Sequence, residues 1–132
     1  MRIIKFRGKR IDNNKWIYGY YFYKWRTKQH VIHLSLLSGV LVDKEFEVIP
    51  KTVGELIGLQ DSEGKDIYEG DIVRFELENK SKDETITHDF KEVYWDSELL
   101  EFGLRYDFKL LHKQFENEFE VIGNVHENPE LR

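Results

Sequence analysis

One stretch, Leu56–Phe75, constrains the fold of this chain more than any other. Its apolar start ends at Asp61–Gly64, a turn signal, and Glu69–Asp71 then opens a new alternating strand. Glycine can adopt φ > 0 without a Cβ clash, so we expect Gly64 and Gly70 to lie at sharp changes of direction. Two strands joined in this way are typical of the start of a small, strongly bent β-barrel. The stretch contains no nucleophile with its base, no phosphate cradle and no ligand cluster, so it indicates a fold and no chemistry.

The composition favours a small β protein without thiol chemistry. A chain of 132 residues supports one domain of ordinary size or two very small ones, and its 14% aromatic content can fill a compact core. Because the chain has no cysteine, disulfides, thiolate metal sites and cysteine nucleophiles are excluded. No apolar run approaches the ~20 residues of a membrane span, and the charged N-terminus lacks the apolar region of a signal peptide. We therefore expect a cytoplasmic protein with no membrane partner.

Charge is distributed unevenly along the chain, whose net charge is −5. Residues 1–33 contain nine Lys or Arg residues against one acid, whereas residues 34–132 contain eleven against twenty-four Asp or Glu residues. The first part therefore carries +8 and the second −13. Such a chain can bind an anion with its basic end, or pair its ends within one molecule or between subunits. We favour pairing between subunits and expect a homo-oligomer.

The first fifty residues read as an aromatic set of antiparallel strands. In Lys15–Trp25 the aromatic residues fall on both faces of a strand, so this strand is buried on both sides or keeps one side for a partner. Asp12–Asn14 forms a turn, which predicts a hairpin between Ile3–Phe6 and Lys15–Tyr23. Further strands are expected at residues 31–37 and 46–49, closed by Pro50.

The rest of the chain reads as a barrel of five strands. They are expected at about residues 52–59, 71–79, 87–95, 99–105 and 118–125. The polar segment 78–87 is expected to be an exposed loop, and residues 108–113 a helical turn or a loop. The sequence therefore predicts an all-β protein with two domains, a basic aromatic β part at residues 1–50 and a barrel at residues 51–132.

Several blocks of the sequence carry a family resemblance because they keep order and spacing together. They are Ile4–Lys9, Trp16–Tyr20, Thr52–Gly54, Gly58–Asp61, Gly64–Lys65, Ile67–Val73, Val93–Trp95 and Val121–Leu131. In these blocks the chain resembles the YopX family, proteins found in phages and in prophage regions of bacteria. The resemblance covers nearly the whole chain, apart from the segment at residues 26–45. It implies an SH3-like β-barrel in the C-terminal part and no particular activity.

The residues that could carry chemistry have simpler interpretations. His30 and His33 are three apart in an expected strand, so they point to opposite faces and do not share one metal ion. Asp71 follows a glycine and is expected to cap a turn by accepting backbone N–H groups. No serine has a nucleophile-elbow setting, and no glycine-rich phosphate motif is present. We therefore expect no enzymatic activity, no metal and no cofactor.

The basic and aromatic N-terminal part is the candidate for binding. Its candidate partner-binding residues are Arg7, Lys9, Arg10, Trp16, Tyr18, Tyr20, Tyr21, Tyr23 and Trp25. Rings at strand spacing are often core, which is the plainer interpretation. The same mixture of cations and rings also binds single-stranded nucleic acid, but the acidic remainder of the chain would repel phosphates. We expect a non-catalytic phage or prophage accessory protein that binds a protein partner or itself, with single-stranded nucleic-acid binding as the alternative.

Overall fold

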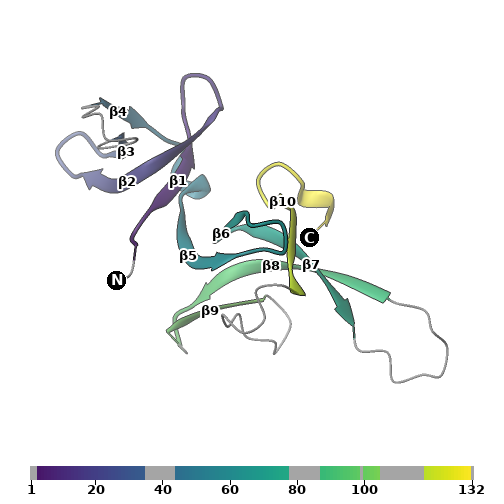
Figure 1. The fold of residues 1–132 in the computed structure, drawn as a ribbon. Helices are drawn as coiled ribbons and strands as arrows, with labels where there is room; N and C mark the ends of the chain where they lie inside the picture. Colours follow the sequence, from purple (N-terminus) through teal and green to yellow (C-terminus); the bar gives the residue numbers. More distant parts are fainter. Residues whose placement is uncertain (1–2, 35–43, 78–86, 99, 105–117, 132) are drawn as a thin grey trace, which may run out of the picture. The chain divides into compact units, whose positions relative to one another are not determined.

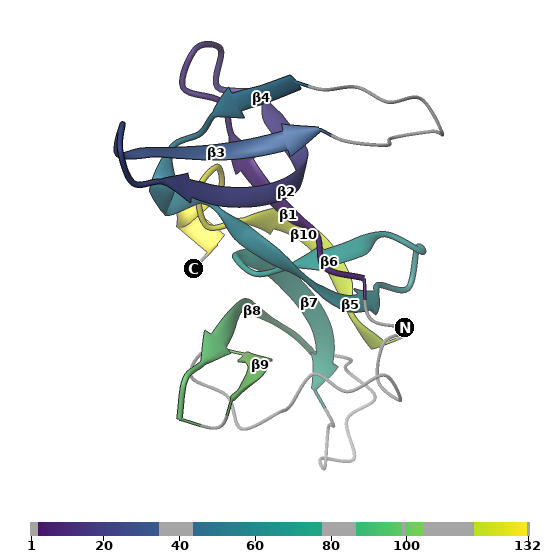
Figure 2. The same ribbon diagram turned by 90° about the vertical axis from the view of Figure 1, so that its left-hand side faces the viewer.

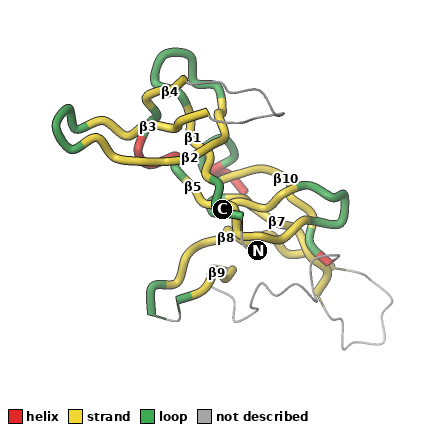
Figure 3. The backbone as a smooth tube through the Cα atoms, turned by 60° about the vertical axis from the view of Figure 1, so that its left-hand side comes forward, coloured by secondary structure: helices red, strands yellow, loops and turns green. Residues whose placement is uncertain are grey.

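The chain folds into strands joined by turns (Figure 3). The computed structural model describes residues 3–34, 44–77, 87–98, 100–104 and 118–131. Helical elements in these ranges are short 3-10 turns, such as η1 (Pro50–Thr52) and η3 (Pro129–Leu131). The expected all-β class is thus confirmed. The chain divides into two compact units, Met1–Leu56 and Ile57–Arg132, whereas the sequence analysis draws the boundary at Pro50.

The first unit is built on an antiparallel sheet (Figure 1). Its strands are β1 (Phe6–Lys9), β2 (Trp16–Lys24), β3 (Gln29–Leu34), β4 (Lys44–Glu47) and the start of β5 (Gly54–Gln60). They lie side by side in the order β4-β3-β2-β1-β5. The β1–β2 hairpin forms around the expected turn, but β1 begins at the residue where the sequence analysis expects it to end.

Strand β2 changes partners at its middle. Its first half, 16–19, pairs with β1 and its second half, 20–24, pairs with β3. Gly19 lies at this change, and a Cβ added there would come within 2.4 Å of the His33 carbonyl oxygen. Glycine is therefore required for β3 to approach β2 this closely.

The core of the first unit lies on one face of this sheet. Ile17, Ile32 and Val48 are buried together, and Phe6, Tyr21, Leu34, Phe46 and Val53 pack against them. The chain after β4 extends this packing, because Val48 N donates to the His30 carbonyl and Ile49 N donates to the Lys9 carbonyl. The segment directly after β4 is thus bonded to both β3 and β1.

The second unit contains a four-stranded antiparallel sheet and a short hairpin (Figure 2). The sheet has the order β10-β7-β8-β9 and is formed by β7 (Asp71–Leu77), β8 (Thr87–Asp96), β9 (Glu101–Leu104) and β10 (Glu120–Asn124). The hairpin joins the end of β5 to β6 (Asp66–Tyr68). The buried core of the second unit consists of Leu59, Ile67, Val73, Phe75, Val93, Leu104 and Phe119.

The predicted barrel differs from the observed strands in two respects. Four predicted strands correspond to β5, β7, β8 and β10, and the strand predicted at 99–105 corresponds to the shorter β9. The sequence analysis missed β6, because three residues give no periodic pattern. The described strands form two antiparallel sheets and do not close into a barrel. The SH3-like arrangement therefore stays a prediction. The expected loop at 78–87 falls, up to residue 86, outside the described residues, as does the whole of segment 108–113.

Candidate binding surface

The two faces of β2 have different surroundings. Ile17, Gly19 and Tyr21 lie on the core side, where Ile17 is buried. On the other side Tyr18, Tyr20 and Phe22 keep 39%, 53% and 39% of their surface exposed. These three rings, two residues apart along one strand, are called the aromatic ladder below. The expectation that this strand is buried on both sides is therefore wrong, and the expectation that one side is kept for a partner stays a prediction.

Cations from β1 lie beside the first half of β2. Arg7 is directly opposite Tyr18 and Lys9 is directly opposite Trp16, so they share the face of the ladder. Arg7 is buried, with its guanidinium carbon 4.7 Å from the centre of the Trp16 ring, and Lys9 Nζ is 5.8 Å from the same centre. Lys5 Nζ lies 5.7 Å from the centre of the Tyr18 ring. Each such cation–π contact contributes about 0.5–1 kcal/mol at an exposed site.

Acids from β4 lie beyond the second half of β2. Glu45 pairs with His33 and Glu47 pairs with Val31 across β3, which itself pairs with residues 20–24 of β2. Glu45 forms an ion pair with Lys24, and Gln29 Nε2 donates to Glu47 Oε2 at 3.2 Å. Across β3, Glu45 is in line with Tyr20 and Glu47 is in line with Phe22. Because the strand order is β4-β3-β2-β1, the cations of β1 and the acids of β4 flank the ladder on opposite sides.

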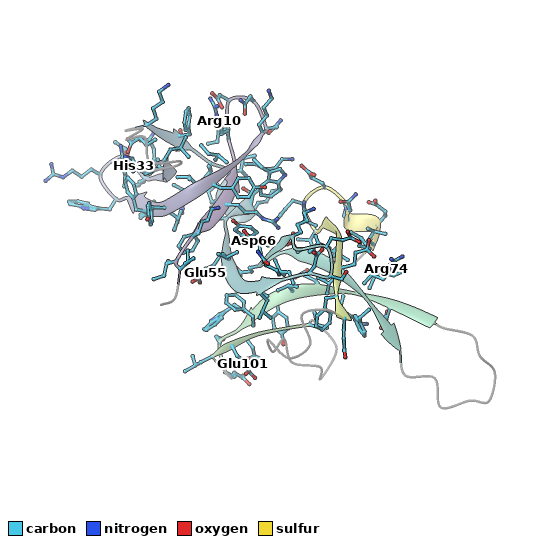
Figure 4. The ribbon with its side chains drawn as sticks, viewed as in Figure 1. Arg10, His33, Glu55, Asp66, Arg74 and Glu101 are labelled. Atoms are coloured by element: carbon cyan, nitrogen blue, oxygen red, sulfur yellow. The ribbon has the colours of Figure 1, made fainter. Side chains whose placement is uncertain are left out.

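Arg10 is already occupied within its own unit (Figure 4). Its Nε and Nη2 donate to the two carboxylate oxygens of Asp12 at 2.9 and 2.5 Å. Its guanidinium carbon lies 4.0 Å from the centre of the Phe46 ring. The hydrogen bonds from Arg10 lower the pKa of Asp12 below its ordinary value. Arg10 thus fixes the turn before β2, and a partner would have to displace Asp12 to reach it.

The remaining candidates do not join the ladder. Tyr21 is half-buried, and its hydroxyl is 2.6 Å from His30 Nδ1. Tyr23 lies on the same side as Tyr21, with its ring centre 4.7 Å from that of His30. Trp25 is 72% exposed in the turn after β2, with the Arg26 guanidinium carbon 5.2 Å from its ring centre. The structure therefore brings Arg7, Lys9, Trp16, Tyr18 and Tyr20 to one face and separates the others from it.

Sequence reasoning missed four residues of this face. Phe22 continues the alternation of Tyr18 and Tyr20, and this period of two could have added it to the candidates. Lys5 could be assigned to this face only from the register of the β1–β2 hairpin. Glu45 and Glu47 could be assigned to it only from the order of β3 and β4. Pairing between strands is not visible in the sequence, so no local pattern indicates these three.

The polar residues of the family blocks bind backbone groups. Buried Asp61 accepts hydrogen bonds from the N–H groups of Glu63, Lys65 and Val121. Asp71 accepts one from Tyr68 N at 2.8 Å, which confirms its expected role as a cap. In the last turn the side-chain oxygen of Asn124 accepts from His126 N and Glu127 N, both at 3.0 Å. The chemistry of these side chains is therefore structural.

The histidine pair does not converge. His30 pairs with Tyr23 and His33 with Tyr20, so the two side chains lie on opposite faces of β3, as expected. Among the residues that the structure describes, no three His, Asp or Glu side chains come together as a metal site. No helix in these same ranges is long and apolar enough to cross a membrane.

Comparison with known proteins identifies the family of this fold. Residues 5–131 match the family model described as YopX protein. The chain belongs to the YopX family. No curated protein matches it. Among solved structures, it is similar to the crystal structure of protein EF1440 from Enterococcus faecalis, with 20% identity, 99% of each chain covered and a TM-score of 0.63. At this identity the likeness shows a shared fold and nothing about function.

Proposed function

We propose that this YopX family member is a non-catalytic binding module, an accessory protein of phage or prophage origin that acts in the cytoplasm. Its contact surface is the aromatic ladder of β2. The observation that carries the proposal is the exposure of Tyr18, Tyr20 and Phe22 in a row on one face. Exposed apolar patches of this kind mark interaction sites in soluble proteins.

The setting of the ladder supports this role. Strand β2 is hydrogen-bonded to β1 along one half and to β3 along the other, which fixes the backbone that carries the three rings. Tyrosine and phenylalanine offer large contact area and lose little side-chain entropy on binding, because each has two χ angles. The proposal that the protein lacks enzymatic activity is supported by Asp61, Asp71 and Asn124, whose side chains serve backbone N–H groups.

An affinity capture from induced or infected cells tests the binding role. Wild-type protein is compared with Tyr20→Ser, which removes the central ring of the ladder, after treatment of the lysate with nuclease. Tyr23→Ser is the matched control, since Tyr23 is 47% exposed on the opposite face of the same strand. We expect the captured partners, further copies of this chain included, to be lost with Tyr20→Ser and kept with Tyr23→Ser. Equal capture by all three proteins would refute the ladder as the contact surface.

Single-stranded nucleic-acid binding is the second candidate, and one contact favours it. Lys5 Nζ lies 5.7 Å from the centre of the exposed Tyr18 ring, so a base stacked there would have a cation beside its phosphate. Titration with labelled single-stranded oligonucleotides at several salt concentrations tests this candidate. Tight binding that weakens steeply with salt would favour it over a protein partner.

We also propose that the second unit has the SH3-like arrangement. It is supported by two bonds that tie the β5–β6 turn to β10: Ser62 N donates to the Phe119 carbonyl at 2.8 Å, and Val121 N donates to Asp61 Oδ2 at 2.9 Å. These bonds join the β5–β6 hairpin to the edge strand β10 of the four-stranded sheet. An NMR structure with contacts between these segments would test it, and their absence would exclude the arrangement.

A further inference from the structure

We propose that the end of the β8–β9 hairpin is a second contact surface, and that its occupant is the end of the β2–β3 hairpin of another copy of this chain. The first surface, called the acidic end below, consists of Trp95, Glu98, Leu100, Glu101 and Phe102. The second, called the basic end, consists of Trp25, Arg26 and Lys28. Neither end belongs to the aromatic ladder, so this contact goes beyond the proposed function. It assigns residues to the homo-oligomer that we expect from the uneven charge of the sequence.

The two hairpins share one backbone feature (Figure 1). In each of them the residue directly before the second strand has a positive φ, which is 56° at Lys28 and 54° at Leu100. Glycine and asparagine suit this left-handed region, whereas other residues rarely adopt it. Both positions therefore carry a side chain that the turn itself does not favour.

Leu100 is unfavourable for folding in two respects. Its side chain is 72% exposed, so it contributes little to the core. Its backbone is held in a conformation that costs free energy at any residue with a Cβ. Residues in such conformations are concentrated at binding sites and switch regions. A partner that covers Leu100 would explain why leucine stands at this position.

The surroundings of Leu100 resemble the anatomy of an interface. Trp95 pairs with Phe102, their ring centres are 4.9 Å apart edge to face, and Trp95 keeps 41% of its surface exposed. Glu98 and Glu101 lie beside this apolar surface, and Figure 4 shows Glu101 at the end of the hairpin. In the described ranges neither carboxylate forms an ion pair. An apolar centre with a charged rim is typical of protein contact surfaces.

The basic end has the complementary properties. Trp25 is 72% exposed, and the Arg26 guanidinium carbon lies 5.2 Å from the centre of its ring. Lys28 is exposed at the other side of the same turn. Neither cation has an ion-pair partner within the part of the chain that the structure describes. The basic end thus offers an aromatic anchor and two cations, where the acidic end offers an apolar surface and two carboxylates.

Charge selects the docking of unlike ends. Two acidic ends repel each other, as do two basic ends, whereas a basic end is attracted to an acidic one. Docked in this way, Trp25 of one copy can pack on Leu100 of the next copy while the cations meet the carboxylates at the rim. Since every copy has one end of each kind, the contact repeats from copy to copy. Such a heterologous contact produces a head-to-tail series of oligomers.

The variant Leu100→Asn separates binding from folding. Sedimentation velocity at several protein concentrations measures self-association, and urea denaturation measures stability. We expect the dissociation constant to rise by roughly tenfold or more, because an apolar anchor is lost. The urea midpoint should not fall, because asparagine tolerates the left-handed backbone. The matched control is Ile11→Asn, since Ile11 is 51% exposed in the turn before β2, and its association should equal that of wild type. A wild-type monomer at every concentration, or association unaffected by Leu100→Asn, would overturn the proposal.

Charge reversal tests the pairing of unlike ends. The variant Arg26→Glu with Lys28→Glu has two acidic ends, and the variant Glu98→Lys with Glu101→Lys has two basic ends. Each should be monomeric alone, although its circular dichroism matches that of wild type. An equimolar mixture should associate, and so should a chain that carries all four substitutions, because both restore a complementary pair of ends. If wild type associates and neither of these does, the pairing of unlike ends is refuted.

The contact between hairpin ends and the aromatic ladder fail in different ways. If the proposal is right, Leu100→Asn weakens self-association and Tyr20→Ser leaves it unchanged. Self-association that depends on Tyr20 and not on Leu100 would refute the contact between hairpin ends and leave the proposed function standing. Capture of another protein through the ladder by a chain that never self-associates would do the same.

Discussion

At the residue scale, the carboxylate of Asp61 joins two separate parts of the second unit. It is 4% exposed and accepts hydrogen bonds from three backbone N–H groups, two in its own turn and one in β10. Hydrogen bonds to a charged group contribute about 1.5–3 kcal/mol each, and the loss of a shared acceptor leaves buried donors unsatisfied. Asp61 thus fixes the β5–β6 turn and its attachment to β10 together.

The first prediction therefore concerns Asp61→Ala. We expect the free energy of unfolding to fall by about 3 kcal/mol or more, because three backbone donors lose their acceptor at once. Urea denaturation followed by tryptophan fluorescence measures it. The matched control is Asp66→Ala, since Asp66 is exposed and its Oδ1 accepts a long 3.3 Å bond from Gln60 Nε2. This control should change the free energy by less than about 0.5 kcal/mol. Equal effects of the two substitutions would contradict the role of Asp61.

A second residue-scale prediction concerns Gly70, which has φ of 93° where β7 begins. A side chain in this left-handed region clashes with the following carbonyl, so Gly70→Ala should cost about 1–2 kcal/mol in unfolding free energy. The control is Gly103→Ala, where the added Cβ meets Tyr94 Cε1 at an ordinary 3.7 Å. Thermal melts of the two variants give the comparison. A melting temperature for Gly70→Ala equal to that of wild type would contradict the requirement for glycine at this position.

Local turn chemistry was predictable from the sequence at this scale. Gly64 and Gly70 adopt the positive φ expected of them, at 78° and 93°, and Asp71 caps the turn between β6 and β7 as expected. These features depend on residues a few positions apart. The bond from Val121 N to Asp61 joins residues sixty positions apart, and no local pattern indicates it.

At the element scale, β2 determines the shape of the first unit. It pairs with β1 over one half and with β3 over the other, and the change occurs at Gly19. The nearest atom to a Cβ added at Gly19 is a backbone oxygen, that of His33, which cannot rotate away as a side chain could. A methyl group at this position therefore has to push β3 away from β2.

The third prediction is that Gly19→Ala destabilises the protein by about 1–3 kcal/mol and loosens β3 specifically. Amide hydrogen exchange should show faster exchange in Gln29–Leu34 than in wild type, with β7 and β8 unchanged. Gly103→Ala is again the control, because its Cβ would meet Tyr94 Cε1 at an ordinary 3.7 Å. Uniformly faster exchange across both units would contradict this local effect.

The elements were predictable where their patterns were long. The alternation of Lys15–Trp25 predicted β2 closely, and the Asp12–Asn14 turn predicted its hairpin with β1. The alternation left open which face of β2 is buried, because both faces carry rings. Ile17 and Gly19 decide it, since Gly19 offers no ring and lies where β3 packs closest. That decision depends on tertiary packing, which a single-strand pattern does not contain.

At the scale of the whole molecule, the uneven charge along the sequence can be compared with the positions of the charged residues in the fold. The first 33 residues carry +8 and the remainder −13, as counted in the sequence. Within the first unit, however, acids of β4 share the ladder face with cations of β1. The charge division along the sequence is therefore not a division into a basic and an acidic surface. The sequence indicated that opposite charges pair, but their places on opposite sides of the ladder required the order β4-β3-β2-β1.

The last prediction concerns the response of self-association to salt. Self-association through the ladder would combine two terms. Ring burial is strengthened or left unchanged by salt, whereas attraction between the cations of β1 and the acids of β4 is screened over a Debye length of about 10 Å at 0.1 M. Light scattering at several protein concentrations should show the dissociation constant rising as sodium chloride increases from about 0.05 to 0.5 M, then levelling off as screening is completed. A wild-type dissociation constant that keeps rising with salt until association is lost would mean that charge alone holds the copies together, and the ladder would then be excluded as their contact.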